Sequence, residues 1–103
     1  MDTKEYKAII TPEAYRAISR IYEYISEDLY AKKVASNLMK LIERAIQYLK
    51  YDPKKHKKIE RTDDLQRNYR RIVIKNYILL FTIDEIDKKV YVSHMFYKKR
   101  NYL

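Results

Sequence analysis

The stretch NYRRIVIKNYILLFTIDEIDKKVYVSHMFYKKRNYL, residues 68–103, sets the architecture that the remaining chain must fit. Three runs in it are rich in β-branched and aromatic residues, and clusters containing Asn or Asp separate them. These runs cover residues 69–75, 77–83 and 90–97. This composition and spacing predict a three-strand antiparallel meander, followed by a cationic end that carries one tyrosine.

The N-terminal part of the chain predicts a short strand and the start of a helix. Over residues 4–10 the side chains alternate between two sets, as in a short strand with two different faces. The sets are Tyr6, Ala8 and Ile10, and Glu5, Lys7 and Ile9. Thr11 then offers a capping hydroxyl, Pro12 suits the first helical position, and Glu13 places an acid in the first turn. A helix is therefore expected to begin at Pro12.

Two apolar stripes at spacings of three and four residues predict a pair of helices before the meander. The stripes consist of Ala14, Ile18, Ile21, Ile25 and Leu29, and of Val34, Leu38, Leu41, Ile42, Ala45 and Leu49. Pro53 ends the second helix, because it forces the preceding residue out of the helical conformation. The short connection predicts an antiparallel hairpin of residues 12–30 and 31–51 on one face of the sheet. The expected fold class is α+β: an N-terminal strand, this antiparallel helical hairpin and a three-strand antiparallel meander.

Length and composition fit a single domain over residues 1–103. A chain of 103 residues buries enough surface to form a core of its own. With no cysteine, the chain offers no disulfide, thiolate nucleophile or cysteine-based metal site, which suits a reducing compartment. No apolar run is long enough to span a membrane, and the N-terminus lacks the layout of a signal peptide. We therefore expect a cytoplasmic protein that does not associate with a membrane.

The positive charge of the chain is concentrated in its second half. The formal net charge is +9, and residues 53–103 carry 14 Lys and Arg against 6 Asp and Glu. This asymmetry indicates a polyanionic partner, either a nucleic acid or an acidic protein. The alternative is a basic surface that serves solubility and has no specific ligand.

The segment between the second helix and the meander predicts a loop. Residues 54–66, KKHKKIERTDDLQ, have no sustained apolar period, although a short strand near residues 58–61 is expected. The chain contains no glycine. Asn68 and Asn76 are therefore expected to serve as turn residues, because Asn tolerates the left-handed conformation best among the remaining residues.

Four segments, taken in order along the chain, carry a resemblance to a known family. They are ITPEA at 10–14, IYEYI at 21–25, YRRI at 69–72 with Asn76 and Tyr77, and FYKKRNY at 96–102. In this order they resemble the RelE/ParE superfamily of bacterial toxins. The resemblance implies a toxin of a type II toxin-antitoxin module that is neutralised by an acidic antitoxin. Members either inhibit DNA gyrase or cleave ribosome-bound mRNA, so the fold leaves the target open.

Cleavage of RNA without a metal needs a base, an acid and cations around the phosphorane. The resemblance implies that Tyr102, with Arg100 nearby, would be the catalytic residues of an RNA-cleaving member. The remaining cations of the meander strand ends are expected to bind the target or its phosphates, and pairing of the strands is expected to bring them to one edge. They are Arg70, Arg71, Lys98 and Lys99.

Two departures from the pattern of RNA-cleaving relatives favour a protein that does not cleave. Such relatives often have an arginine directly after the tyrosine that opens the second meander strand, but Tyr77 is followed by Ile78. Some have a histidine before the terminal tyrosine, where this chain has Asn101. Together with the long helical hairpin, these departures favour a ParE-like gyrase inhibitor. The alternatives are a RelE-like mRNA endoribonuclease and a non-toxic basic domain that binds nucleic acid.

His94 is expected to be structural rather than a catalytic base, and neither histidine is expected to bind a metal. His94 shares the phase of Val90, Val92 and Phe96 in its strand, which predicts a packed histidine in or beside the core. His56 lies among lysines that disfavour its protonated form. Neither has further ligands at metal-binding spacing, so we expect no metal and no cofactor.

Overall fold

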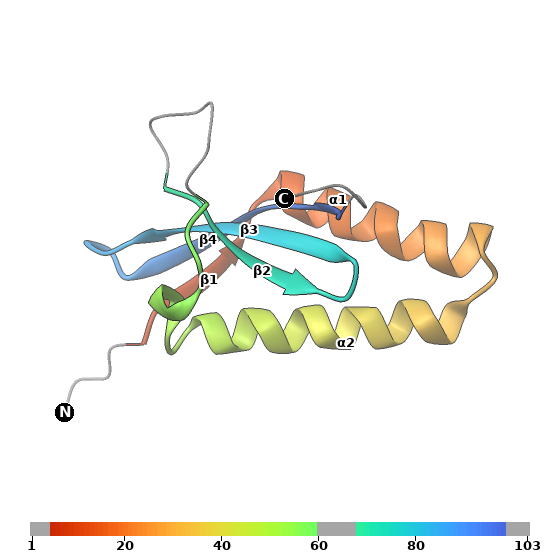
Figure 1. The fold of residues 1–103 in the computed structure, drawn as a ribbon, viewed down its shortest axis with the longest axis horizontal. Coiled ribbons are helices and arrows are strands. Elements are labelled where there is room, and N and C mark those ends of the chain that lie inside the picture. The colour runs from red at the N-terminus through yellow and green to blue at the C-terminus, as the bar shows by residue number, and fades with distance from the viewer. Residues whose placement is uncertain (1–4, 60–67, 99–103) are drawn as a thin grey trace.

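The computed structural model describes residues 5–59 and 68–98, and it contains the predicted α+β elements in the predicted order (Figure 1). They are β1 (Lys7–Ile10), α1 (Pro12–Glu23), a π-helical turn (Tyr24–Asp28), α2 (Lys32–Leu49), a 3-10 turn (Pro53–Lys55), β2 (Arg70–Ile74), β3 (Tyr77–Asp84) and β4 (Lys89–Tyr97). No helix in the described ranges is both long and apolar enough to cross a membrane.

The helical hairpin begins as the sequence predicts but changes pitch at its tip. The Ala14 N–H donates a hydrogen bond of 3.2 Å to Thr11 Oγ1, and Pro12 occupies the first turn. The helix expected over residues 12–30 instead passes at Tyr24 into the π-helical turn. The second helix, expected over residues 31–51, is α2.

The sheet has four strands in the order β1-β4-β3-β2. β2, β3 and β4 form the predicted antiparallel meander. β1 lies parallel to β4, because the two helices return the chain to the same end of the sheet before the meander begins. The pairing continues into the helix cap, where the Thr11 N–H donates to the Val92 carbonyl at 2.9 Å.

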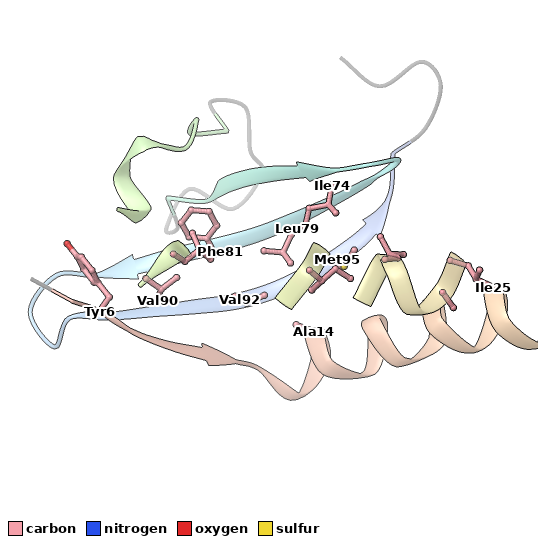
Figure 2. Packing of buried hydrophobic residues seen from close by; sticks show 13 residues of the cluster. Tyr6, Ala14, Ile25, Ile74, Leu79, Phe81, Val90, Val92 and Met95 are labelled. Carbon is pink, nitrogen blue, oxygen red and sulfur yellow. The ribbon is translucent and has the colours of Figure 1, made fainter. Parts of the chain in front are cut away.

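The core lies between the helical hairpin and one face of the sheet (Figure 2). From the sheet it takes Ile74, Leu79, Phe81, Val90, Val92 and Met95, and from the helices it takes Ala14, Ile25, Ala35, Leu38, Ile42 and Leu49. Ala14 and Ala35 are completely buried. Their small side chains let the helices approach the sheet closely enough for the larger residues to pack.

A β-bulge in β4 changes which residues face the core. Phe81 pairs with Val92 and Leu80 with His94, so Ser93 is the extra residue of the bulge. The core-facing positions therefore shift by one, and Met95 is buried. The prediction that His94 packs in or beside the core is wrong, because the bulge turns its side chain to the exposed face.

Asn76 lies in the β2–β3 turn as predicted, but other residues adopt the left-handed conformation of the turns. Neither Asn68 nor Asn76 has a positive φ, and Lys75 takes the left-handed conformation of the β2–β3 turn, with φ of 55°. In the β3–β4 turn Lys88 does the same, while Asp84 Oδ1 accepts the N–H groups of two residues that follow it. The turns were therefore placed correctly, but the residues expected to adopt the left-handed conformation were wrong.

The segment after α2 pairs with the start of β2. The Arg71 N–H donates to the Lys57 carbonyl at 3.1 Å, and the Ile59 N–H donates to the Tyr69 carbonyl at 2.9 Å. Lys58 forms an isolated antiparallel bridge with Arg70. The short strand expected near residues 58–61 is thus a single bridge in its described part, and residues 60–67 lie outside the described ranges.

Candidate functional site

The face of the sheet opposite the helices, called here the outer face, combines apolar and cationic side chains. Alternation along the strands places on it Tyr69, Arg71, Val73, Ile78, Leu80, His94 and Phe96. Ile78 is completely buried and pairs with Val73 on one side and Phe96 on the other. Val73 and Phe96 are 47% and 37% exposed, so an apolar surface occupies the centre of this face.

His94 belongs to a polar cluster on the outer face. Its ring meets the Tyr69 ring edge to face at 5.8 Å, and its Nδ1 lies 2.9 Å from Ser93 Oγ. Arg71 pairs with Leu80, which pairs in turn with His94, so Arg71 and His94 lie at one level of the sheet. In the sequence, two consecutive polar residues, Ser93 and His94, interrupt the apolar and aromatic residues of this strand. This interruption is the signal that could have revealed the cluster. Within the described ranges, no three His, Asp or Glu side chains converge to hold a metal ion.

Arg70 lies on the other face of the sheet and binds the basic segment after α2, residues 54–58. Its Nη1 donates to the carbonyls of Lys54 at 3.1 Å and His56 at 2.8 Å. The His56 ring packs edge to face against Phe81 at 5.8 Å. Burial, reinforced by the charge of Lys55, lowers the pKa of His56, so its imidazole is neutral near pH 7. The neighbouring cations thus act as the sequence predicts, but burial is the larger cause.

Glu85, in the β3–β4 turn, holds the same basic segment from a second direction. Its carboxylate lies 2.9 Å from Lys54 Nζ and 3.2 Å from Lys88 Nζ, and it accepts the Tyr6 hydroxyl at 3.1 Å and 3.0 Å. The hydrogen bond from Lys54 is the main reason why the pKa of Glu85 is lowered to about 2. Arg70 thus binds the backbone of the segment that carries the exposed lysines of residues 54–58, and Glu85 binds the side chain of its first lysine.

The register of the sheet separates the predicted cations from one another. Lys98 follows His94 by four residues along the direction of β4, which corresponds to about 13 Å. Arg71 lies level with His94, so the backbone positions of Arg71 and Lys98 are at different levels of the sheet. That these two cations bind one target together stays a prediction. Lys99, Arg100 and Tyr102 lie outside the described residues.

On the helix side, an apolar groove runs between the tip of the helical hairpin and the end of β4. It consists of two adjoining depressions of about 590 Å³ and 480 Å³, which share Leu29 and Tyr77. The first is lined by Ala17, Arg20, Ile21, Tyr24, Met95, Phe96 and Tyr97, and the second by Ile25, Ala31, Val34, Asn37, Leu38, Leu41, Lys75 and Asn76. We call it the tip groove.

Tyr77 lines both depressions of the tip groove. Its ring meets Tyr97 edge to face at 5.6 Å. Burial, followed by the nearby phenols of Tyr97 and Tyr24, raises the pKa of Tyr77. Tyr77 therefore stays neutral at physiological pH and acts in the groove as an apolar ring with a hydrogen-bonding hydroxyl.

Comparisons with known proteins agree with this architecture. The family model for the ParE toxin of the type II toxin-antitoxin system, parDE, matches residues 8–102. No curated protein matches the sequence of the chain. Among solved structures, the chromosomal ParDE toxin-antitoxin system from P. aeruginosa is similar with a TM-score of 0.74 at 11% identity, over 94% of this chain and 100% of that chain.

Two further structures have the same fold. The archaeal RelE-RelB complex from Pyrococcus horikoshii OT3 gives a TM-score of 0.65 at 16% identity, over 93% of this chain and 98% of that chain. The toxin-antitoxin complex RelBE2 from Mycobacterium tuberculosis gives 0.61 at 18% identity, over 91% and 92% of the two chains. At these identities, the similarity is one of fold and leaves activity to be argued from the site.

Proposed function

The chain belongs to the ParE toxin family of type II toxin-antitoxin systems, and we propose that it arrests growth by binding and inhibiting DNA gyrase. The toxin acts in the cytoplasm in this proposal, and it binds its target through the outer face and the cationic end of β4. An acidic antitoxin neutralises it.

The burial of Ile78 is the observation that carries the choice of gyrase. RNA-cleaving relatives often keep an arginine at the position after Tyr77, where a cation can contact phosphate. Here that position holds a side chain with no exposed surface, packed in register between Val73 and Phe96. Val73 and Phe96 are exposed on either side of it, so the accessible centre of the outer face is apolar, which suits contact with a protein surface better than contact with a phosphodiester.

Two observations support an antitoxin partner: the net charge of the chain, and the presence of toxin-antitoxin complexes among the structures with a similar fold. The chain carries a net charge of +9, which favours an acidic partner. The similar structures from P. horikoshii and M. tuberculosis are complexes of a toxin with its antitoxin. An acidic antitoxin segment can gain affinity by ordering on such a basic surface.

Ribosome-dependent mRNA cleavage is the second candidate, and the cluster around His94 favours it. An exposed imidazole can accept a proton, and Arg71 at the same level of the sheet can stabilise a phosphorane. In this mechanism Tyr102 and Arg100 would be the other catalytic residues, as the resemblance implies. The reaction needs these groups within hydrogen-bonding reach of one scissile phosphate.

Labelling of DNA and protein synthesis after induction tests the proposal in cells. We expect incorporation of thymidine to fall before incorporation of methionine, because a blocked gyrase stops replication first. Co-expression of the small protein encoded beside the gene should restore growth. An early fall in methionine incorporation would favour the ribosome as target, and unimpaired growth at high expression would leave a non-toxic basic domain that binds nucleic acid.

A further inference from the structure

We infer that the basic segment, residues 54–58, binds the phosphate backbone of duplex DNA, so that the toxin binds gyrase together with the DNA on which gyrase acts. This inference rests on the proposed function, because it assigns part of the target-binding surface to the nucleic acid that the enzyme holds. It follows from the free charges of the segment, from the contacts that fix its backbone and from its place beside the outer face.

The basic segment carries three lysines whose charges are unpaired among the described residues. Four of its five residues are lysines. Glu85 pairs with Lys54, but Lys55, Lys57 and Lys58 are exposed and make no ion pair within the described ranges. Such a cluster of free cations creates a positive potential that attracts a polyanion.

The fold holds these lysines together although their charges repel one another. Arg70 adds a further cation beneath the segment when it donates to the carbonyls of Lys54 and His56. At His56, burial lowers the pKa most, and the charges of Lys55 and Arg70 lower it further. A segment that is fixed in this way presents its lysines to a ligand without a large loss of backbone freedom on binding.

The strand register places Lys57 on the outer face, directly opposite Arg71. The segment lies along β2, the edge strand of the sheet, with which it forms an isolated antiparallel bridge (Figure 1). The Arg71 N–H donates to the Lys57 carbonyl on one side of this bridge, and the Ile59 N–H donates to Tyr69 on the other. In this pattern Lys57 and Arg71 are cross-strand partners, which lie on the same face about 5 Å apart. The two cations therefore continue the outer face to the edge of the sheet.

The segment offers cations but no exposed apolar side chain. His56 and the adjoining Ile59 are half-buried, and Pro53, which precedes the segment, is buried. A protein partner needs apolar or aromatic anchors that become buried at the centre of the interface. A nucleic-acid backbone needs only cations, and its interfaces are more positive than those between proteins. The segment therefore fits a phosphate backbone better than an acidic protein.

The same composition favours a duplex over a single strand. Proteins bind single-stranded nucleic acids with aromatic side chains that stack on unpaired bases. Residues 53–59 include no Phe, Tyr or Trp, and the His56 ring is already in contact with Phe81. Lysines contact phosphates as point charges and do not read the bases. The expected ligand is therefore duplex DNA, bound without regard to its sequence.

The apolar centre of the outer face and the basic segment are close enough to bind different parts of one target. Val73 follows Arg71 by two residues along β2, which corresponds to about 7 Å. Val73 and Phe96 are exposed and offer contact to a protein, while Lys57 and Arg71 offer contact to phosphates. A complex of gyrase with DNA presents both kinds of surface, whereas gyrase alone presents only the first.

Titration of a short labelled DNA duplex of mixed sequence with the purified chain, followed by fluorescence anisotropy, tests the inference. We expect Lys55→Gln, Lys57→Gln and Lys58→Gln together to weaken binding by about 100-fold at about 0.1 M salt, because three phosphate contacts are lost. The slope of log affinity against log salt should fall by about three. If the triple variant loses its circular dichroism spectrum, the single change Lys57→Gln decides, with a slope that falls by about one.

The matched control removes the same charge from another exposed surface. It is Lys32→Gln, Lys33→Gln and Lys40→Gln, three exposed positions of α2. The control should bind the duplex within about 3-fold of the wild type, because its lysines contact no phosphate in this arrangement. Equal affinity of the two triple variants for the duplex would overturn the inference, even where the wild type inhibits gyrase.

A supercoiling assay connects the segment with gyrase. The triple variant of the segment should need about 10-fold or more protein than the control for half-inhibition, while both bind gyrase equally in the absence of DNA. Tighter binding of the wild type to a single-stranded RNA than to the duplex would overturn the inference. Loss of antitoxin affinity with unchanged DNA affinity would overturn it as well, by giving the segment to the antitoxin. A wild type that binds the duplex through the segment but leaves gyrase active would refute the proposed function and keep the DNA site.

Discussion

Arg70 and Arg71 are neighbours in the chain, yet they serve opposite faces of the sheet. The Arg70 guanidinium donates hydrogen bonds to two carbonyls of the basic segment. Arg71 lies on the outer face, at the same level of the sheet as His94. Sequence alone gave both residues the same expected role in target binding. Their separation depends on strand alternation and on carbonyls 14 and 16 residues earlier in the chain, which no local pattern reveals.

Substitution of the two arginines should therefore have different effects. Arg70→Ala should lower the free energy of unfolding by about 2 kcal/mol, because charge-assisted hydrogen bonds to two carbonyls are lost. Arg71→Ala should change stability by less than about 0.5 kcal/mol and weaken target binding instead. Urea denaturation of both variants measures this difference. Equal destabilisation by the two changes would mean that Arg71 is also a structural residue.

The network around Glu85 predicts how stability depends on acid. Its pKa is lowered to about 2, so the ion pairs stabilise the folded chain fully above the unfolded pKa of about 4.5 and are lost as pH falls toward 2. Glu85→Gln removes this dependence. The difference in urea midpoint between the wild type and Glu85→Gln should be constant above about pH 5 and should shrink steadily below pH 4.5. A difference that persists unchanged at pH 3 would contradict the role of the carboxylate.

At the scale of the elements, β4 shows where sequence reasoning succeeds and where it stops. Its existence and its antiparallel pairing with β3 follow from its β-branched and aromatic residues. The bulge at Ser93 does not, because one inserted residue leaves composition unchanged while it reverses the facing of every later side chain. The π-helical turn of the hairpin escaped prediction similarly, since its apolar stripe continues through Ile25 and Leu29.

The bulge predicts which of two adjacent residues supports the fold. Met95→Ala should cost about 2 to 5 kcal/mol, because it leaves a cavity in the core. His94→Ala should cost less than about 1 kcal/mol, because the side chain is exposed. Chemical denaturation of both variants provides the comparison. A larger loss of unfolding free energy from His94→Ala than from Met95→Ala would mean that His94 faces the core, as in a strand without a bulge. This result would contradict the observed register of β4.

At the scale of the whole molecule, two surfaces on opposite sides of the sheet converge on the end of β4. The outer face carries an apolar centre with Arg71, and the tip groove on the helix side reaches Tyr97. The order of the elements and the helical hairpin were predictable, since their caps, apolar stripes and turns are local. The parallel pairing of β1 with β4 was not predictable, and neither was the tip groove that the hairpin forms with the sheet. Both arise from contacts between distant parts of the chain.

A supercoiling assay with purified gyrase decides between the two targets. We expect the wild-type chain and Tyr102→Phe to inhibit supercoiling about equally, and Arg100→Ala to lose inhibition, because binding to gyrase requires a cationic surface and no proton transfer. Ribosome-bound mRNA should remain intact with all three proteins. The opposite result would be unimpaired supercoiling together with mRNA cleavage by the wild type that falls by about 100-fold or more in Tyr102→Phe, the loss expected when a general acid or base is removed.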